Sequence, residues 1–389
     1  MVPKLRFKEF CGEWEEKRLG DICKINPKNE SLPDTFNYID LENVVDGRLL
    51  KFNNTISKNN APSRAKRLLQ NNDILYQTVR PYQKNNFYFD IEETEIPYVA
   101  STGYAQLRTD KNNPKFIFQE IHTDIFVNNV LERCTGTSYP AINSSDLGNI
   151  RFTIPSLSEQ TKIADFLSTV DDKIQNQQDK ITHFENIKKG FMQKIFSRKI
   201  RFKDDGREVF PEWEETELKN KVDIIMGQSP SSDSYNEEKI GVPLVQGNAD
   251  IKNRMTFPIR YTNKPTKICK KGSLIMTVRA PVGYIGKANQ EVCIGRGVCE
   301  IQVKKCNSEY IYQFLMSKED SWDKISQGST FTSISSNDIK KLKIHIPPLP
   351  EQTKIADFLS SFDEKISKEK DIQEHLKEIK KGLLQQMFV

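Results

Sequence analysis

Two stretches of the chain are rich in side chains that bind phosphate and read the edges of nucleic-acid bases. Arginine and lysine pair with phosphate or guanine, and asparagine and glutamine fit adenine. The first stretch supplies the candidate DNA-binding residues Arg64, Lys66, Arg67, Gln77, Arg80, Tyr82 and Lys84. The second supplies Gln246, Asn248, Lys252, Arg254, Lys270, Lys271, Arg279, Tyr284, Lys287 and Arg296. Taken singly, each residue is most often a solvated surface side chain, so the prediction concerns the regions.

The positive charge of the chain is concentrated in the same two stretches. The whole chain carries a net charge of only +5, from 58 Lys and Arg against 53 Asp and Glu. From Arg48 to Lys84, however, there are 8 basic residues and one acid, and from Lys252 to Arg296 there are 10 basic residues and one acid. Two such excesses at related places predict a polyanionic partner, which the net charge alone does not.

Signatures of catalysis are missing from the sequence. There is no Gly-x-x-x-x-Gly-Lys-[Ser/Thr] loop for a nucleotide, and the only adjacent prolines, Pro347-Pro348, do not form the Asn-Pro-Pro-Tyr of an amino-methyltransferase. The histidines, His122, His183, His345 and His375, have no metal-ligand spacing to one another or to cysteine. We therefore expect a protein that is not an enzyme and holds no metal or cofactor of its own.

Composition predicts a cytoplasmic protein of about two domains. The 389 residues are 37% hydrophobic with a mean hydropathy of −0.62, and no apolar run reaches the length of a membrane span. The start of the chain is charged where a secretory signal would be apolar. The seven cysteines are odd in number and include no Cys-x-x-Cys, so we expect them to be reduced.

The chain contains an internal repeat. Residues 154–168 recur as residues 346–360, an offset of 192, and 16 of the 21 positions from Ile154 to Ile174 are identical in the second copy. Fainter matches lie upstream, where Trp14 pairs with Trp213 and Thr78-Val79-Arg80 with Thr277-Val278-Arg279. The sequence therefore reads as a variable head and a similar helix, each present twice.

Each repeat is expected to form a long helix with a coiled-coil seam. Its apolar residues recur at steps of three and four. The predicted seam is Ile163, Leu167, Val170, Ile174, Ile181, Phe184, Phe191 and Ile195, with Ile355, Leu359, Phe362, Ile366, Leu376 and Leu383 in the second copy. From Ser158 to Phe196 such a helix would be about 58 Å long. Two such helices most naturally pair antiparallel, and a helical hairpin used for oligomerisation is the alternative.

The heads are expected to be mixed α/β domains with many short strands. β-branched and aromatic runs broken by Asn, Gly and Pro predict strands at Phe36–Leu41, Asp73–Val79, Asn86–Phe89, Ala105–Arg108, Ile240–Val245, Ser273–Val278 and Val298–Val303. Helices are expected at Pro114–Asn129 and Ser308–Met316. The predicted domains are a first head at 1–157, a spacer helix at 158–199, a second head at 200–349 and a spacer helix at 350–389. The predicted fold is thus two α/β heads joined by an antiparallel two-helix coiled coil with pseudo-two-fold symmetry.

With its repeated Ile-Pro-x-Leu-x-Glu-Gln-x-Lys-Ile-Ala motif after each head, the sequence resembles the specificity subunit of type I restriction-modification systems over essentially its whole length. Weaker matches are Trp14 and Trp213, Ser63–Arg67, Met226–Ser231 and Gly241–Gly247. The resemblance implies two target-recognition domains that read a bipartite, asymmetric site on double-stranded DNA. It also implies a non-catalytic chain that docks two methyltransferase subunits and two restriction subunits. S-adenosylmethionine, ATP and Mg would then belong to those partners.

Two other classes of protein remain open from the residues alone. A coiled-coil scaffold with basic heads would bind an acidic partner without reading a DNA sequence. A stand-alone nuclease or methyltransferase is the third alternative. Preference for one duplex over scrambled competitor at physiological salt separates the DNA reader from the scaffold.

Overall fold

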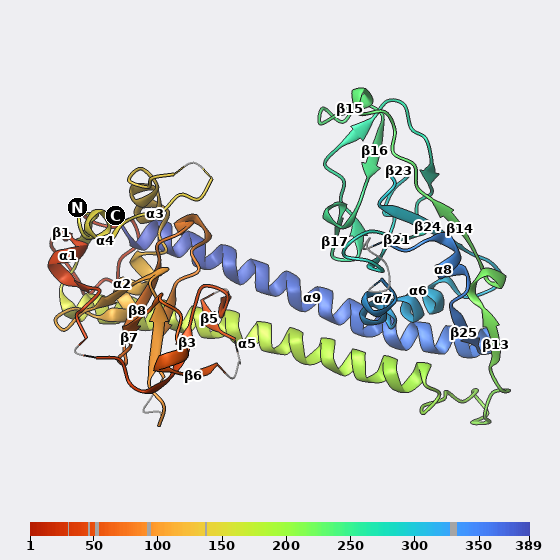
Figure 1. Cartoon of the computed structure of the whole chain (residues 1–389), viewed down its shortest axis with the longest axis horizontal. Helices are drawn as coiled ribbons and strands as arrows, with labels where there is room; N and C mark the ends of the chain where they lie inside the picture. Colours follow the sequence, from red (N-terminus) through yellow and green to blue (C-terminus); the bar gives the residue numbers. More distant parts are fainter. Residues whose placement is uncertain (30, 46, 51–53, 92–94, 137, 327–332) are drawn as a thin grey trace. The chain divides into compact units, whose positions relative to one another are not determined.

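The computed structural model describes residues 1–29, 31–45, 47–50, 54–91, 95–136, 138–326 and 333–389. The chain divides into two compact units (Figure 1). Unit 1 comprises Met1–Gln178 and Asp371–Val389, and unit 2 comprises Asp179–Lys370. The long helices α5 (Leu157–Phe196) and α9 (Leu349–Met387) each contribute to both units. We call the remainder of unit 1 the first head and the remainder of unit 2 the second head.

The first head is built from small sheets and short helices. Its sheets have the strand orders β1-β12, β6-β3-β10-β7, β2-β11-β8-β9 and β4-β5. The strands are β1 (Glu15–Arg18), β2 (Lys24–Ile25), β3 (Thr35–Ile39), β4 (Val44–Val45), β5 (Arg48–Leu49), β6 (Thr55–Ser57), β7 (Ala65–Leu68), β8 (Asp73–Gln77), β9 (Phe87–Phe89), β10 (Tyr98–Ser101), β11 (Tyr104–Arg108) and β12 (Arg151–Ile154). The helices are α1 (Leu19–Ile22), α2 (Pro114–Glu120), α3 (Asp124–Leu131) and α4 (Ser144–Gly148), with the 3-10 turns η1 (Lys58–Asn60) and η2 (Pro81–Gln83).

The second head has the same kinds of element with larger sheets. Its sheets have the orders β13-β25, β14-β24-β21-β22-β18-β17 and β15-β19-β16-β23-β20. The strands are β13 (Glu214–Glu217), β14 (Val222–Met226), β15 (Tyr235–Asn236), β16 (Val242–Val245), β17 (Ile251–Lys252), β18 (Met255–Thr256), β19 (Tyr261–Thr262), β20 (Ile268–Cys269), β21 (Leu274–Thr277), β22 (Ile285–Lys287), β23 (Val292–Ile294), β24 (Val298–Val303) and β25 (Lys343–Ile346). The helices are α6 (Ser308–Met316), α7 (Glu319–Ser326) and α8 (Ser336–Lys340), with the 3-10 turns η3 (Leu218–Asn220), η4 (Ser232–Ser234) and η5 (Asn248–Asp250).

In both heads, the first strand pairs antiparallel with the strand that leads into a long helix. Glu15 of β1 lies opposite Ile154 of β12, and Glu214 of β13 lies opposite Ile346 of β25. Each head therefore begins and ends at the start of the helix that follows it, which fixes where the head is attached.

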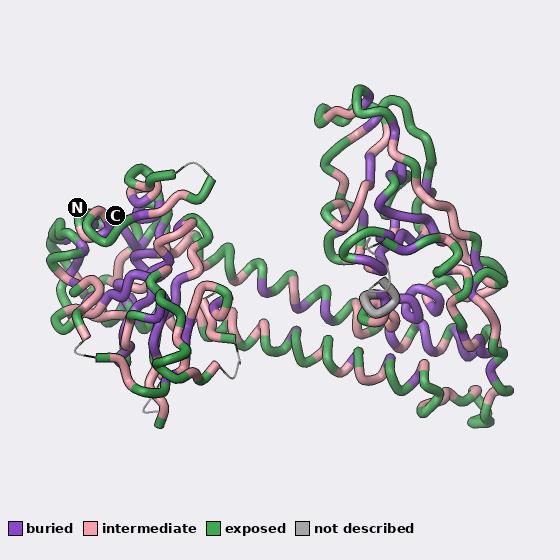
Figure 2. The backbone as a smooth tube through the Cα atoms, in the orientation of Figure 1, coloured by how far each residue is buried: buried purple, intermediate pink, exposed green. Residues whose placement is uncertain are grey.

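The main core of each unit combines a head with parts of both long helices. In unit 1, the rings of Trp14, Phe116 of α2 and Phe388 lie with centroids 5.3–6.2 Å apart. In unit 2, the ring centroid of Tyr310 of α6 lies 6.2 Å from that of Trp213 and 5.7 Å from that of Phe196 of α5. Edge-to-face contacts of Trp14 with Phe388 and of Tyr310 with Phe196 pack the heads against the ends of the long helices. Figure 2 shows buried backbone concentrated inside each head, whereas stretches of α5 and α9 away from the heads are largely exposed or intermediate.

The predicted seam residues differ in burial. Ile163, Leu167, Ile181, Ile195, Ile355, Leu359 and Ile366 are buried, and Val170, Ile174, Phe184, Phe191, Phe362, Leu376 and Leu383 are partly buried. Several of them face a head as well as the neighbouring helix. Ile163 and Leu167 belong to the core of unit 1, and Ile195, Ile355 and Leu359 to the core of unit 2.

The single helix predicted at Pro114–Asn129 is wrong. The structure has α2 and α3 there, separated by residues 121–123. The Thr123 side chain accepts a hydrogen bond from the backbone N–H of Phe126 at 3.1 Å, and this N-cap starts a new helix. The long helices begin at Leu157 and Leu349, one residue earlier than expected. All seven predicted strands are present, with ends shifted by up to two residues, and α6 has the predicted bounds.

Candidate nucleic-acid interface

In the first head, a strained turn presents Arg80 and Tyr82. The turn η2 follows β8 and is flanked by Arg80 and Lys84, whose backbones are left-handed with φ of 54° and 53°. Residues other than glycine rarely adopt this backbone conformation. Those that do are often found at functional sites. The Arg80 guanidinium lies 4.4 Å from the centroid of the Tyr139 ring, and Tyr82 is 49% exposed. A cation on a ring and an exposed aromatic side chain suit contact with phosphates and bases.

Other predicted residues hold this turn from inside. Gln77 is buried, and its side-chain amide donates to Gln83 Oε1 at 2.9 Å. Lys84 donates to the carbonyl of His122 at 2.9 Å and to Asp124 at 2.8 Å. Gln77 and Lys84 thus position the turn, and their direct contact with DNA stays a prediction.

The strand β7 carries the other predicted cations of the first head. Arg64, directly before the strand, and Lys66 are exposed, whereas Arg67 is partly buried. Burial lowers the pKa of the Arg67 guanidinium below its usual value. Arg64 and Lys66 are therefore the residues of this group that solvent, and hence a duplex, can reach.

In the second head, close backbone approach brings the Met226–Ser231 motif together with the predicted binding residues Gln246 and Arg296. A Cβ at Gly297 would lie 2.0 Å from the carbonyl oxygen of Gln246, and one at Gly227 would lie 2.2 Å from that of Gly295. Only glycine fits at such distances. The Ser229 hydroxyl accepts a hydrogen bond from the backbone N–H of Arg296 at 3.2 Å. The Met226–Ser231 motif, the Gln246 turn and exposed Arg296 thus form one cluster.

The remaining candidates of the second head fall into exposed and internal groups. Lys252, Lys270, Lys271 and Arg279 are exposed, and Asn248, like Gln246, is partly buried. Arg279 follows β21 in a turn held by Thr277, whose hydroxyl accepts from the N–H of Tyr284 at 3.0 Å and donates to the carbonyl of Pro281 at 2.6 Å. The exposed cations are available to a polyanion.

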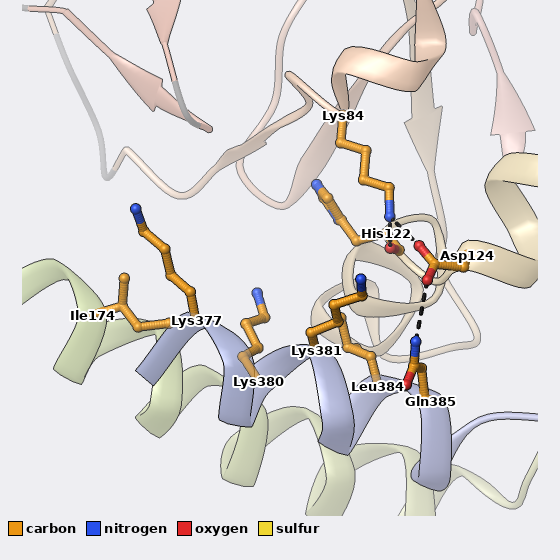
Figure 3. Close-up of a pocket in the computed structure, with 9 residues that line it drawn as sticks. All are labelled: Lys84, His122, Asp124, Ile174, Lys377, Lys380, Lys381, Leu384 and Gln385. Atoms are coloured by element: carbon orange, nitrogen blue, oxygen red, sulfur yellow. Dashed lines mark hydrogen bonds and ion pairs between the residues drawn. The ribbon is translucent and has the colours of Figure 1, made fainter. Parts of the chain in front are cut away.

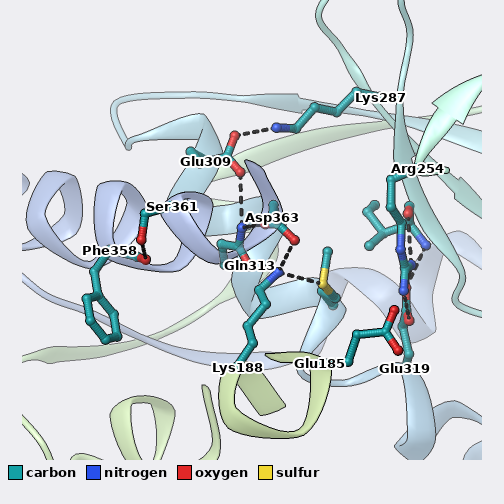
Figure 4. Close-up of polar contacts among 12 residues, drawn as sticks. Glu185, Lys188, Arg254, Lys287, Glu309, Gln313, Glu319, Phe358, Ser361 and Asp363 are labelled. Carbon is teal, nitrogen blue, oxygen red and sulfur yellow. Dashed lines mark hydrogen bonds and ion pairs between the residues drawn. The ribbon is translucent and has the colours of Figure 1, made fainter. Parts of the chain in front are cut away.

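Arg254 and Lys287, by contrast, point into the head, where they form ion pairs (Figure 4). Arg254 makes two hydrogen bonds to Glu319 of α7, at 2.5 and 3.0 Å, and lies 4.2 Å from the centroid of the Tyr284 ring. Lys287 pairs with Glu309 of α6 at 2.5 Å. Arg254 and Lys287 thus fasten the sheet side of the head to α7 and α6, and Tyr284 packs against the Arg254 guanidinium.

The sequence reading missed a pair of arginines that attach the heads to the long helices. In unit 1, Arg6 donates to both carboxylate oxygens of Glu159, at 2.7 and 2.8 Å, and the Trp14 indole donates to the same group at 3.3 Å. In unit 2, Arg201 donates to both oxygens of Glu351 at 2.9 Å, and the Trp213 indole also donates at 2.9 Å. Both carboxylates are at most 2% exposed.

Buried carboxylates need such donors, because an unpaired buried charge is costly. The Glu of each Glu-Gln motif is thus explained as a docking point for the head. A signal for the arginines is present in the sequence, since Arg6-Phe7-Lys8 recurs as Arg201-Phe202-Lys203.

The Gln of each repeated motif also binds the head that precedes it, at the start of a helix: α2 in the first head and α6 in the second. The side-chain oxygen of Gln160 accepts from the backbone N–H of Asn113 at 3.0 Å, and that of Gln352 accepts from Asn307 at 2.8 Å. Asn113 and Asn307 are the N-caps of α2 and α6. The repeated motif therefore binds equivalent helix starts in the two heads.

A third shared contact joins each head to both long helices. In unit 2, Asp363 of α9 accepts from Gln313 of α6 at 2.7 Å and pairs with Lys188 of α5 at 2.6 Å (Figure 4). Burial lowers the pKa of the Lys188 ammonium, although Asp363 partly opposes that effect. In unit 1, Asp171 of α5 accepts from Gln119 of α2 at 2.7 Å and pairs with Lys380 of α9 at 2.5 Å.

No metal constellation accompanies these contacts in the part of the chain that the structure describes. Within the described ranges, no group of at least three His, Cys, Asp or Glu side chains could hold a metal ion. Over the same residues, no helix has the length and apolar character needed to cross a bilayer.

Comparisons with known proteins agree with this architecture. The family model described as "Type I restriction modification DNA specificity domain" matches residues 12–186 and 211–378, so each match takes in one copy of the repeated motif. The putative type I restriction enzyme MjaX specificity subunit of Methanocaldococcus jannaschii is 35% identical over 253 residues, which are 63% of this chain and 60% of that subunit. The MjaVIII specificity subunit of the same organism is 24% identical over 97% of this chain and 94% of its own length.

Solved structures share this fold. A chain from a structure on complex assembly and conformational transition of the type I R-M system is 27% identical, with a TM-score of 0.55 over 95% of this chain and 96% of that one. The type I restriction-modification S subunit of M. genitalium, 17% identical, shares the fold with a TM-score of 0.58 over 100% and 99% of the two chains. With its matched halves covering most of the sequence, this chain belongs to the family of type I restriction-modification DNA specificity subunits.

Proposed function

We propose that the chain reads a bipartite, asymmetric DNA site, with one half-site for each head. The observation that carries the proposal is that the two heads are attached by the same contacts but expose different side chains. Glu159 and Glu351 bind equivalent Arg and Trp donors. The exposed candidates, by contrast, are Arg64, Lys66 and Tyr82 in the first head and Lys252, Lys270, Lys271, Arg279 and Arg296 in the second. Different side chains select different bases, so the two half-sites should differ.

The proposal includes an antiparallel coiled coil of α5 and α9 as the spacer, arranged about a pseudo-two-fold axis. Residue numbers rise along one helix as they fall along the other in the contacts within each unit. In unit 1, Gln373 donates to Gln178 at 2.9 Å, beside the Asp171–Lys380 pair. In unit 2, Lys180 pairs with Glu369 at 2.7 Å and Glu185 with Lys370 at 2.8 Å, beside Lys188–Asp363. These pairs support one register along the spacer.

We further propose that the chain is non-catalytic and works in a complex with two methyltransferase and two restriction subunits. S-adenosylmethionine, ATP and Mg would be bound by those partners. The support is family membership, together with the likeness of this chain to one from a solved structure that concerns assembly of a type I R-M complex.

Exchange of one head tests the two-head reading. Residues 1–150 are replaced by those of a relative with another target, and the sequence methylated by the assembled complex is determined. Only one half of the methylated site should change. A change in both halves, or in neither, would contradict the proposal.

Lengthening the spacer tests whether the helices set the gap between half-sites. In the proposed register Gln175 would lie opposite Leu376, so a seven-residue insertion after Gln175 needs a second one before Leu376. Seven residues keep the seam on the same face and add about 10 Å, or about three base pairs of duplex. The unread gap should lengthen by about that amount. An unchanged gap with normal methylation would mean that the helices do not set it.

A further inference from the structure

A cavity of about 360 Å³ in unit 1 lies between the first head and the long helices. Figure 3 shows Lys84 and Asp124 reaching it from the head, and Lys377, Lys380 and Lys381 rising toward it from α9. The lysines of α9 stand at spacings of three and four residues, so they share one face of the helix. Four lysines thus line the cavity. Asp124 is the one acidic residue among the described residues of its lining.

The negative charge near the cavity is already engaged. Asp124 accepts from Lys84 at 2.8 Å and from Gln385 at 3.4 Å. The hydrogen bond from Lys84 chiefly lowers the pKa of the Asp124 carboxyl, and the charge of Lys381 adds to this effect. Lys380 pairs with Asp171 at 2.5 Å. Lys381 has no ion-pair partner within 4.0 Å among the described residues, and Lys377 pairs only with exposed Glu374, at 2.9 Å. The lining of the cavity therefore carries positive charge that these carboxylates do not neutralise.

His122 also lines the cavity but adds no charge to it. Its Nδ1 lies 2.6 Å from the carbonyl oxygen of Phe118, so Nδ1 carries the proton and Nε2 can accept from the Asn86 amide at 3.3 Å. Burial, with the nearby charges of Lys380 and Lys84, lowers the pKa of His122 to about 4. The positive charge of the cavity is thus supplied by lysine at neutral pH.

We propose that this cavity binds a phosphate group of the DNA backbone next to the half-site read by the first head. This inference rests on the proposed function. Lys84 joins the cavity to the turn that presents Arg80 and Tyr82, so a duplex on that turn would bring its backbone near the cavity. A phosphate would also relieve the repulsion among like charges on one helix face.

In unit 2, the equivalent positions of α5 differ in charge or are already paired, which makes the inference specific to unit 1. At the repeat offset of 192, Lys377 is replaced by Glu185, and the counterpart of Lys381, Lys189, pairs with Asp320 at 2.6 Å. The extra phosphate contact should therefore serve the first half-site only.

The test is the double variant Lys377→Ala/Lys381→Ala, assembled with methyltransferase subunits and titrated with target duplex at several salt concentrations. These lysines are chosen because Lys84 and Lys380 also have structural ion pairs. We expect affinity to fall about five- to ten-fold at low salt, and the slope of log K against log [salt] to drop by about 1–2, with unchanged preference for target over scrambled DNA. Lys377→Arg/Lys381→Arg should keep the slope. Lys4→Ala/Lys8→Ala removes two exposed lysines elsewhere in unit 1 and is the charge-matched control.

Each other outcome overturns the inference. An unchanged affinity and slope would mean that no phosphate binds in the cavity. Impaired binding of the methyltransferase subunit with normal DNA affinity would identify an acidic protein partner. Inorganic phosphate could instead stabilise the unmodified chain but not the double variant at matched ionic strength, while the two bind DNA equally well. That result would identify a small-anion site. Failure of the proposed function would look different, since the unmodified complex would then show no preference for any duplex.

Discussion

Arg6 and Glu159 form a two-pronged ion pair that joins residues 153 positions apart, with N–O distances of 2.7 and 2.8 Å. Arg201 and Glu351 form the same pair in the other unit. The sequence repeats both the Arg-Phe-Lys triplet and the Glu-Gln motif, but only the fold shows that the Arg of one pairs with the Glu of the other. This pairing explains why the Glu of the repeated motif is kept in both copies.

Removal of this carboxylate charge should destabilise unit 1. Glu159 is 2% exposed and Arg6 13%, so Glu159→Gln leaves a largely buried guanidinium without its counter-charge, at a cost of about 3 kcal/mol. Urea unfolding of the full chain measures the change. The control is Glu16→Gln, because Glu16 pairs with Arg151 at 3.0 Å where both side chains are more than half exposed, and its loss should cost less than about 1 kcal/mol. Equal stability of the two variants would contradict the assigned role of Glu159.

The Lys188–Asp363 pair should show strong coupling in unit 2. The Lys188 side chain is only 5% exposed, so Asp363→Ala leaves a buried ammonium unpaired and should cost about 3 kcal/mol. Replacing Lys188 by Met in the same chain removes the buried charge and should restore much of that loss. A double-mutant cycle from denaturant unfolding measures the coupling. Additive effects of the two substitutions would show that the pair is energetically unimportant.

Exposed and internal arginines of the second head should behave differently. Arg279→Ala and Arg296→Ala should each weaken binding of target duplex by about 1–3 kcal/mol without lowering stability, because both side chains are exposed. Arg254→Ala should instead lower the free energy of unfolding, since it removes the counter-charge and two hydrogen bonds of Glu319. Duplex titration and thermal unfolding of the same three variants separate the effects. Loss of DNA affinity without loss of stability in Arg254→Ala would place Arg254 on the DNA.

The buried carboxyl of Glu120 should make the stability of the first head depend on pH. Burial raises the pKa of this carboxyl from 4.5 to about 8. Between these values the folded chain binds more protons at this group than the unfolded chain, so the group's contribution to stability falls as pH rises from 4.5 to 8. Glu120→Gln, which cannot ionise, should therefore be more stable than the unmodified chain at about pH 8, and the advantage should shrink toward about pH 5. An advantage independent of pH would show that Glu120 does not titrate as described.

The sequence predicted local elements well and side-chain partners poorly. Strand β24 and helix α6 have the expected bounds because their propensities and end signals are local. The break between α2 and α3 was missed because apolar residues continue across it, while a single Thr123 side chain sets the new helix start.

Charge counting failed for the internal cations of the second head. The basic stretch ends at Arg296, and the partners Glu309 and Glu319 lie beyond it on α6 and α7. Arg254 and Lys287 therefore looked like surface cations. The contact that corrects this reading is set by helix packing, which charge along the chain does not record.

We propose above that the two heads read two different half-sites of DNA. The most direct measurement is a genome-wide map of methylated adenines in cells with and without this gene. We expect a methylated motif present only with the gene, made of two unlike specified parts separated by an unread gap of fixed length. A methylation pattern that does not depend on the gene, or a motif that is a single uninterrupted palindrome, would contradict it.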